Sequence, residues 1–300
     1  MISTRQLKYL DAVARLGHFG RAAEHCGVTQ PALSMQIAQL ERALAVTVFE
    51  RRPHGIALTE AGREIARRAA AILLEIQELS DFAASSRGVL ASPIRLGVIP
   101  TIAPYMLPDL MKALRLRHPG LTLQIRETQT AVLLKELGTG DLDVVVLALP
   151  VPQAEFETVE LRIDKFVLAL PADRVVKSRV RIPSRLLESD RLLLLEEGHC
   201  LRDQALDVCR LRPSGDADTL GASTLSTLVQ MVRGGLGMTL LPQISIAQEA
   251  IRSGIRLVRF ADPEPQRVIG LAWRRTSPRK RDFLELASLI REALPAEDLE

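Results

Sequence analysis

The apolar residues near the start of the chain recur with a helical period. Residues 4–16 carry apolar side chains three or four positions apart, and a second run after Thr29 repeats this spacing. The apolar stripe of the second run consists of Leu33, Ile37, Leu40 and Leu44. Gly27 allows a tight turn just before the second run, and Pro31 fits the first turn of the helix that follows. The pattern predicts a helix-turn-helix.

The face of residues 30–44 opposite the apolar stripe carries groups that suit DNA. Thr29 stands where it can cap this helix, and Gln30 and Ser34 can hydrogen-bond base edges or phosphates. We therefore expect the N-terminal end of the helix to enter a major groove. The residues assigned to DNA here are Thr29, Gln30, Pro31, Ser34 and Met35. The alternative is an ordinary antiparallel helix pair.

Residues 48–62 contain two short strand-like runs around a Pro/Gly turn. This pattern predicts a β-hairpin wing, with Arg51 and Arg52 placed to meet DNA phosphates. On their own, two arginines on a turn are usually only solvated.

Residues 5–62 as a whole resemble the winged helix-turn-helix of LysR-type transcriptional regulators. The motifs that carry the resemblance are Phe19-x-x-Ala22-Ala23, Thr29-Gln30-Pro31-Ala32-Leu33-Ser34, Ile37-x-x-Leu40-Glu41, Phe49-Glu50-Arg51 and Leu58-Thr59-x-Ala61-Gly62. The resemblance implies a DNA-binding domain at residues 1–58 and double-stranded promoter or operator DNA as the partner. Cys26 lies inside this module, and we interpret it as a core residue.

A long helix is predicted from Thr59 to about Ser85, because this stretch is rich in helix formers. Its apolar residues fall near a heptad spacing, which indicates a packing partner. The family resemblance implies a homodimer through this helix and a tetramer overall. We assign residues 59–91 to this linker helix and the hinge that follows it.

The pattern changes after residue 92 to alternating strands and helices. Strands are expected at residues 94–99, 121–126, 142–149, 166–170 and 192–195, and helices at residues 104–118, 130–139 and 223–233. This alternation predicts an α/β domain at residues 92–300 with a mostly parallel sheet. The resemblance implies a periplasmic-binding-protein-like effector domain of two α/β subdomains. Subdomain I would comprise residues 93–164 and 268–300, and subdomain II residues 165–267.

Two of the three cysteines, Cys200 and Cys209, lie in one short segment that reads as a helix. Cys200 would stand near the helix N-terminus between His199 and Arg202, where the helix dipole and cationic neighbours lower a thiol pKa. Nine helical residues separate the Cα atoms by about 13 Å, whereas a disulfide needs less than about 7 Å. Joining the two thiols would therefore require the segment to unwind.

The sequence around Cys200 adds a sharper resemblance within the family. The run His199-Cys200-Leu201-Arg202-Asp203-Gln204-Ala205, followed by Cys209, looks like that of the peroxide-sensing LysR-type regulators. The resemblance implies that Cys200 is the peroxidatic thiol and Cys209 the resolving thiol. The residues it places in the peroxide pocket are Thr101, Thr130, His199, Asp203 and Arg267.

Three points stay open at this stage. Thr130 could instead cap a helix, and Arg267 could form a surface ion pair with Glu264. The operative switch could be the Cys200–Cys209 disulfide or the Cys200 sulfenic acid alone.

The amino-acid composition excludes few classes of function. A net charge of +3 permits a nucleic-acid partner, and 3% aromatic residues argue against stacking platforms for single strands. The cysteine spacing offers no metal site, and we expect no cofactor. We expect neither a signal peptide nor a membrane span, and hence a cytoplasmic protein in which thiols are kept reduced.

The sequence therefore predicts a peroxide-responsive transcription factor whose output is DNA occupancy, and not an enzyme. The family resemblance implies activation of antioxidant genes through RNA polymerase, and reset by a thiol reductant. Activation and repression by the reduced state both stay open. One alternative is a LysR-type regulator that binds a small metabolite, with incidental cysteines. The other is a thiol peroxidase, against which residues 5–62 argue.

Overall fold

The computed structural model divides the 300-residue chain into two compact units, residues 1–83 and 84–300. The residues that it describes are 2–52, 55–85, 88–174, 181, 191–209, 221–250 and 254–295. The side chains of Arg51, Ser85 and Cys209 lie outside this description. Ser86 and Arg87 of the predicted hinge also lie outside it.

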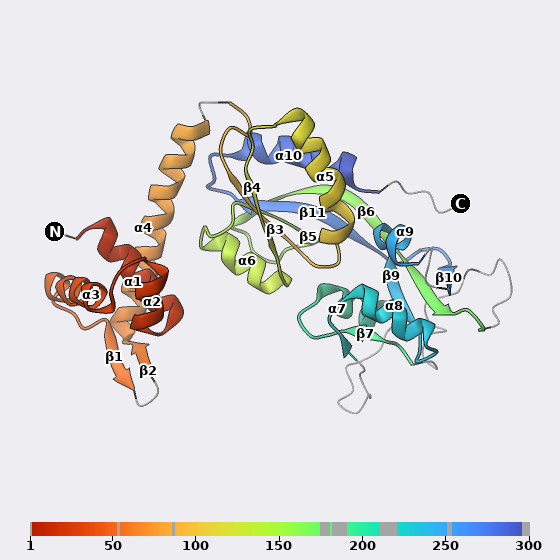
Figure 1. The fold of residues 1–300 in the computed structure, drawn as a ribbon, viewed down its shortest axis with the longest axis horizontal. Coiled ribbons are helices and arrows are strands. Elements are labelled where there is room, and N and C mark those ends of the chain that lie inside the picture. The colour runs from red at the N-terminus through yellow and green to blue at the C-terminus, as the bar shows by residue number, and fades with distance from the viewer. Residues whose placement is uncertain are drawn as a thin grey trace. The chain divides into compact units, whose positions relative to one another are not determined.

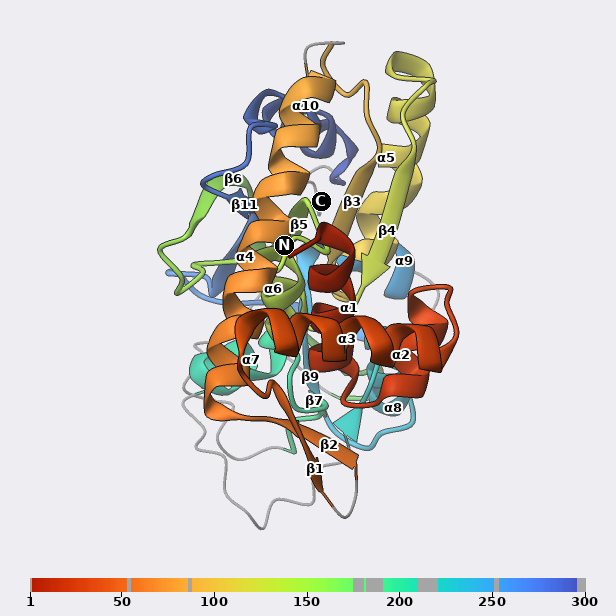
Figure 2. The same cartoon turned by 90° about the vertical axis from the view of Figure 1, so that its left-hand side faces the viewer.

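The first unit is a bundle of three short helices, a hairpin and a long helix (Figures 1 and 2). The helices are α1 (Thr4–Leu16), α2 (Phe19–His25), α3 (Gln30–Leu44) and α4 (Glu60–Ser85), and the hairpin strands are β1 (Phe49–Arg52) and β2 (Gly55–Leu58). The strands pair antiparallel, with Phe49 opposite Leu58. The predicted helix-turn-helix and wing are confirmed.

Local signals set the ends of the first two helices. Ser3 and Gln6 form a capping box at the start of α1. Gly17 ends that helix in the left-handed region, with φ of 62°. The imidazole Nδ1 of His18 then accepts hydrogen bonds from the backbone amides of Gly20 and Arg21, which starts α2. The chain turns sharply between the two helices as a result.

Small residues and one apolar stripe pack the bundle. Ala22 and Ala23 are buried, as are Leu33, Ile37 and Leu40 of α3. Cys26 follows the last residue of α2, half-buried against this core, and burial raises the pKa of its thiol. This agrees with a structural role for Cys26.

The second unit is built on a seven-stranded sheet in the order β10-β6-β11-β5-β3-β4, with β9 also paired to β6. The strands are β3 (Ile94–Val98), β4 (Leu123–Glu127), β5 (Val144–Leu149), β6 (Phe156–Pro171), β9 (Thr239–Pro242), β10 (Ile255–Arg259) and β11 (Gln266–Arg274). Only β3 pairs in parallel, with β4 and β5; the other pairings in this sheet are antiparallel. The expectation of a mostly parallel sheet was wrong, because the long strands β6 and β11 run against their neighbours.

Strand β6 joins the two halves of the sheet. Its first part pairs with β11, where Asp164 lies opposite Arg267 and Lys165 opposite Gln266. From Phe166 onwards it pairs instead with β9 and β10. The strand therefore exchanges partners immediately after Asp164.

Helices cover both faces of the β3–β4–β5 part of the sheet. Helices α5 (Ala103–Arg117) and α10 (Lys280–Ala293) lie side by side on one face, and α6 (Thr130–Gly138) lies on the other (Figure 1). Helix α5 leads from β3 to β4, and α6 leads from β4 back past β3 to β5. Because both connections are right-handed and run in opposite directions across the sheet, the two helices lie on opposite faces.

Smaller elements surround the second half of β6. They are β7 (Leu194–Leu195), α7 (Cys200–Cys209), β8 (Gly221–Ala222), α8 (Leu225–Arg233), a 3-10 turn (Gln243–Ser245) and α9 (Ile246–Glu249). Strands β7 and β8 form a separate parallel pair. The strand expected at residues 192–195 is shorter than predicted, because β7 comprises only Leu194 and Leu195.

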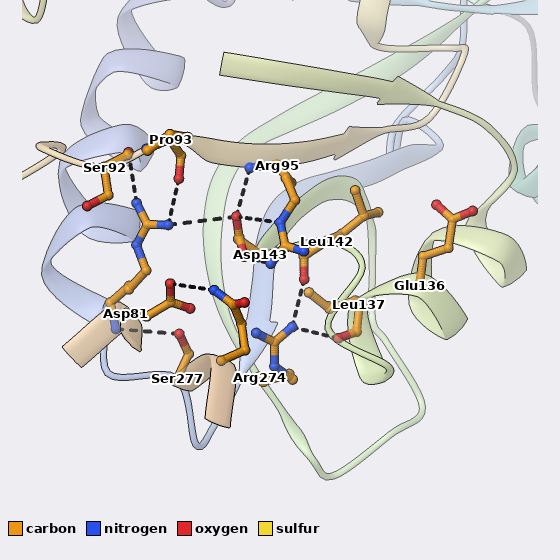
Figure 3. A network of polar contacts seen from close by, with 12 residues as sticks. Asp81, Ser92, Pro93, Arg95, Glu136, Leu137, Leu142, Asp143, Arg274 and Ser277 are labelled. Atoms are coloured by element: carbon orange, nitrogen blue, oxygen red, sulfur yellow. Dashed lines mark hydrogen bonds and ion pairs between the residues drawn. The ribbon is translucent and has the colours of Figure 1, made fainter. Parts of the chain in front are cut away.

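A buried polar network fixes the entry of the chain into the second unit (Figure 3). Arg279, 3% exposed, donates from Nη1 to the Pro93 carbonyl at 2.8 Å and from Nη2 to the Ser92 carbonyl at 3.1 Å. Its Nε donates to Asp282 at 3.0 Å, and Asp143 lies 3.7 Å from its Nη1. The entering backbone is therefore tied to the start of α10.

The substitution Arg279→Met should destabilise the second unit by about 3 kcal/mol, because it leaves the buried Asp282 carboxylate with the Leu90 amide but without its cationic partner. Trp273 is the single tryptophan of the chain and is 1% exposed, so its fluorescence during urea unfolding reports this unit. Arg281→Met, at an exposed position of the same helix, should change the unfolding free energy by less than about 0.5 kcal/mol. Equal effects would contradict the assigned role of Arg279.

Candidate functional site

The carboxyl ends of two neighbouring parallel strands bring Thr101 and Thr130 to one edge of the sheet. Thr101 follows β3, and Thr130 begins α6 after β4. The Thr128 amide donates to the Val98 carbonyl at 3.3 Å, so the two loops lie against each other. Polar groups at this edge of an open α/β sheet are typical of a ligand site.

Arg267 lies beside Thr101 and is fully buried. Its Nη1 donates to Thr101 Oγ1 at 2.8 Å, and its Nη2 donates to the Thr101 carbonyl at 3.1 Å. Its Nε donates to Asp164 Oδ2 at 2.9 Å, and the other carboxylate oxygen accepts from the Ile244 amide at 3.1 Å. The side chains of Arg267 and Asp164 have no exposed surface.

The alternative of a surface ion pair between Arg267 and Glu264 is excluded. The Glu264 carboxylate contacts Lys165 Nζ at 2.6 Å and Arg181 Nη1 at 3.7 Å. These cations hold the pKa of Glu264 below its usual value, chiefly through the hydrogen bond from Lys165. Arg267 is committed to Asp164 and Thr101 instead.

This arrangement can stabilise charge that develops on a small polar guest. The Thr101 hydroxyl accepts from Arg267, so its own hydrogen is left to donate. Arg267 and Asp164 are buried, and a buried guanidinium acts on a nearby oxyanion with little screening.

Thr130 occupies the first turn of α6, but it does not cap that helix. The N-cap residue is Gln129, and Thr130 Oγ1 is buried without a hydrogen-bond partner among the described residues. The interpretation of Thr130 as a helix cap was therefore wrong. An unsatisfied buried hydroxyl requires some explanation, and a guest molecule would supply one.

Cys200 begins α7, as the sequence predicts. Its free thiol is half-buried against the core of the second unit. The loop before it is held by the Glu196 amide, which donates to the Ala222 carbonyl at 3.0 Å, and by Arg202 Nη1, which donates to the Leu195 carbonyl at 3.2 Å. The Cys209 side chain lies outside the described part of the chain.

His199 is 8% exposed, and this burial affects its charge state. Burial lowers the pKa of the His199 imidazole below its ordinary value of 6.5, and the Glu196 carboxylate only partly opposes this effect. The imidazole is therefore neutral at pH 7. Of the hydrogen-bond donor or positive charge that His199 could offer beside the thiol, the lowered pKa of the imidazole favours the hydrogen-bonding role.

Gln129 joins the edge of the sheet to the loop before Cys200. Its Nε2 donates to the Glu197 carbonyl at 3.1 Å. Gly198, the next residue, has φ of 91°, and a Cβ at this position would overlap the Gln129 carboxamide. Residues 129 and 197 are 68 positions apart, so no local sequence pattern indicates this contact.

The remaining predicted pocket residue, Asp203, lies in the first turn of α7 and is exposed. The structure thus brings together Thr101 and Arg267 directly, and adds Asp164, which the sequence analysis missed. Among the residues described, no group of three metal-ligating side chains is gathered.

The predicted DNA face lies on the surface of the first unit. Thr29, Gln30 and Pro31 are exposed, Met35 is 54% exposed, and Ser34 is half-buried. Thr29 precedes α3, but its side chain forms no capping hydrogen bond. Of the wing arginines, Arg52 is exposed and pairs with Glu50 at 2.8 Å, whereas the Arg51 side chain is outside the described residues.

The lowered pKa of His199 predicts a pH effect on the second unit. The folded state favours neutral imidazole, so the unfolded chain binds more protons as the pH falls through 6.5. The associated stability is full above about pH 6.5 and is lost below it. Unfolding followed by Trp273 fluorescence should show a difference between wild type and His199→Gln that shrinks from pH 7.5 to pH 5.5. A pH-independent difference would contradict the burial effect.

None of the helices in the described part of the chain has the length and apolarity of a bilayer span.

Comparison with known proteins matches both units to one family. Residues 4–63 match the bacterial regulatory helix-turn-helix of the lysR family, and residues 87–295 match the LysR substrate binding domain. Among curated proteins, a probable hydrogen peroxide-inducible genes activator of Streptomyces viridosporus is 45% identical over 97% of this chain and 94% of its own length. The DNA-binding transcriptional dual regulator OxyR of Escherichia coli is 38% identical, with coverages of 97% and 95%.

Solved structures agree with these matches. A full-length OxyR variant from Pseudomonas aeruginosa has a TM-score of 0.78 and 36% identity, with 99% of both chains covered. A hydrogen peroxide-bound OxyR mutant of Corynebacterium glutamicum has a TM-score of 0.67 and 33% identity, with coverages of 97% and 92%. The chain therefore belongs to the LysR family of bacterial transcriptional regulators, and OxyR proteins are among its full-length relatives.

Proposed function

We propose that the chain is a peroxide-sensing, DNA-binding transcriptional regulator in which Cys200 is the sensor. The observation that carries the proposal is the buried constellation of Arg267, Asp164 and Thr101. The unsatisfied Thr130 hydroxyl follows the neighbouring parallel strand at the same edge of the sheet. It lies at the sheet edge that Gln129 connects to the Cys200 loop. Hydrogen peroxide is small and polar enough for such a site, and one OxyR relative is described with this ligand bound.

The chemistry takes two steps. The Cys200 thiolate attacks one peroxide oxygen, the O–O bond breaks, and the departing hydroxide takes up a proton to become water. The product is Cys200 sulfenic acid. Donors such as the Thr101 hydroxyl and the Arg267 guanidinium would stabilise the departing oxygen, because they are already oriented.

In the second step the Cys209 thiolate attacks the sulfenic sulfur, and hydroxide leaves and is protonated to water. Two thiols and one peroxide thus give one disulfide and two waters. The pocket roles of His199 and Asp203, like that of Cys209, rest on the family resemblance.

Helix geometry makes this disulfide a conformational switch. Helix α7 runs from Cys200 to Cys209, so their Cα atoms stand about 13 Å apart in a regular helix. The bond requires less than about 7 Å. Oxidation therefore has to unwind α7, and the refolded segment repacks the effector domain.

The output is DNA occupancy and not catalytic turnover. In this proposal, dimers form through α4, tetramers form through further contacts, and oxidation changes the spacing of the DNA-binding units. Contacts with RNA polymerase then activate antioxidant genes, and a thiol reductant resets the disulfide. The protein works in the cytoplasm, where the reduced state is the resting state.

Near-stoichiometric peroxide should create a Cys200–Cys209 linkage that non-reducing peptide mass spectrometry detects. The linkage should be absent in Cys200→Ser and should disappear after treatment with a thiol reductant. Two free thiols in oxidant-treated wild type would overturn the redox mechanism.

The DNA-binding assignment predicts a specific effect of Gln30→Ala. Affinity for a sequence selected from a random duplex pool should fall about tenfold, because one base contact is worth about 1–3 kcal/mol. Affinity for unselected duplex should stay within about twofold. Gln39→Ala changes another exposed residue of α3 and should leave both affinities unchanged. Equal losses on both DNAs would count against base reading by Gln30.

A further inference from the structure

The loop that precedes Cys200 is held on the side of α6 by a single side chain. Gln129 Nε2 donates to the Glu197 carbonyl at 3.1 Å. Among the residues that the structure describes, no other hydrogen bond joins α6 or the loop before it to residues 196–209. Gln129 is therefore the one polar tie between that side of the site and the sensor segment.

The backbone at Gly198 fits closely around this tie. Gly198 has φ of 91°, a conformation that side-chain-bearing residues rarely adopt. A Cβ on Gly198 would overlap the Gln129 carboxamide, so the missing side chain lets the two groups approach. The amide thus contacts the loop at two successive residues, Glu197 and Gly198.

The Gln129 side chain can make this contact because it forms no hydrogen bond with the first turn of its own helix. It stands at the N-cap position of α6, where a short polar side chain usually caps the helix, yet its side chain forms no capping hydrogen bond. The side chain extends to Glu197 instead. The N-cap residue of α6 therefore supports the loop before Cys200 and leaves its own helix without a side-chain cap.

We propose that Gln129 is a positioning residue that latches the Cys200 segment in its dithiol conformation and must release when α7 unwinds. This inference rests on the proposed function. The latch contacts only the loop before Cys200 and not the thiol, so it acts on the conformational step and not on the first reaction with peroxide.

In this proposal the hydrogen bond is made only on the dithiol side of the equilibrium, so loss of the latch should favour the disulfide. This hydrogen bond is exposed, so water competes with it and its net contribution lies at the low end of the usual range, about threefold in an equilibrium constant. For a two-electron couple, threefold corresponds to about 15 mV towards a more negative reduction potential.

The test compares full-length wild type with Gln129→Met, which keeps the side-chain length and removes the donor. Gln124→Met, at an exposed position on β4, is the matched control. Each protein is equilibrated in glutathione buffers of graded redox ratio, and the Cys200–Cys209 disulfide is quantified by mass spectrometry. Gln129→Met should contain about threefold more disulfide relative to dithiol than wild type, and Gln124→Met should match wild type.

A second measurement uses the reduced proteins and does not depend on the disulfide. Hydrogen exchange of the backbone amides of Leu201–Val208 should be faster in Gln129→Met than in either other protein, because α7 has lost a restraint. The rate of Cys200 sulfenic acid formation, measured with a trapping reagent, should be unchanged in all three.

The outcomes separate the latch from the proposed function. If wild type forms no disulfide, the redox function itself fails. If wild type forms it and Gln129→Met has the same potential and the same exchange, the latch is wrong while the function stands. A slower first step in Gln129→Met, without a shift in potential, would also overturn the latch and assign Gln129 to peroxide binding instead.

Discussion

The ion pair between Arg267 and Asp164 is the constraint on which the rest of the effector unit depends. The two side chains have no exposed surface, and they face each other where β6 leaves β11 for β9 and β10. Removing either partner would leave an uncompensated buried charge, which typically costs several kcal/mol. The same guanidinium holds both the hydroxyl and the carbonyl of Thr101. One interaction therefore joins the halves of the sheet and fixes Thr101 of the candidate site.

The sensor side of the site is built differently. Cys200 is half-buried at the start of a ten-residue helix, and the preceding loop is held by a few hydrogen bonds and one glutamine. A buried donor set and a separately held thiol segment suit a switch, because the donor set can persist while the segment refolds. The neutral state of His199 fits this division, since a buried imidazolium would add a charge that nothing nearby fully compensates.

Local sequence signals predicted much of the fold, whereas long-range pairing escaped them. Helical periodicity located α1, α3, α4 and α7 to within a residue or two. The direction of β6 depends on partners a hundred residues away, so no local pattern could show it. A β-bulge near Leu161 also changes which residues of β6 point into the core. Beyond this bulge, the Asp164 side chain is buried. Gln129 was missed because its role depends on a glycine nearly seventy residues further along the chain.

The central claim is that peroxide at Cys200 unwinds α7, and hydrogen exchange of residues 200–209 in the full-length protein after one equivalent of peroxide tests it most directly. The account predicts that amides protected in the reduced helix lose protection in wild type and keep it in Cys200→Ser. Unchanged protection in oxidised wild type would contradict the account, because a disulfide between helix positions nine residues apart cannot form without unwinding.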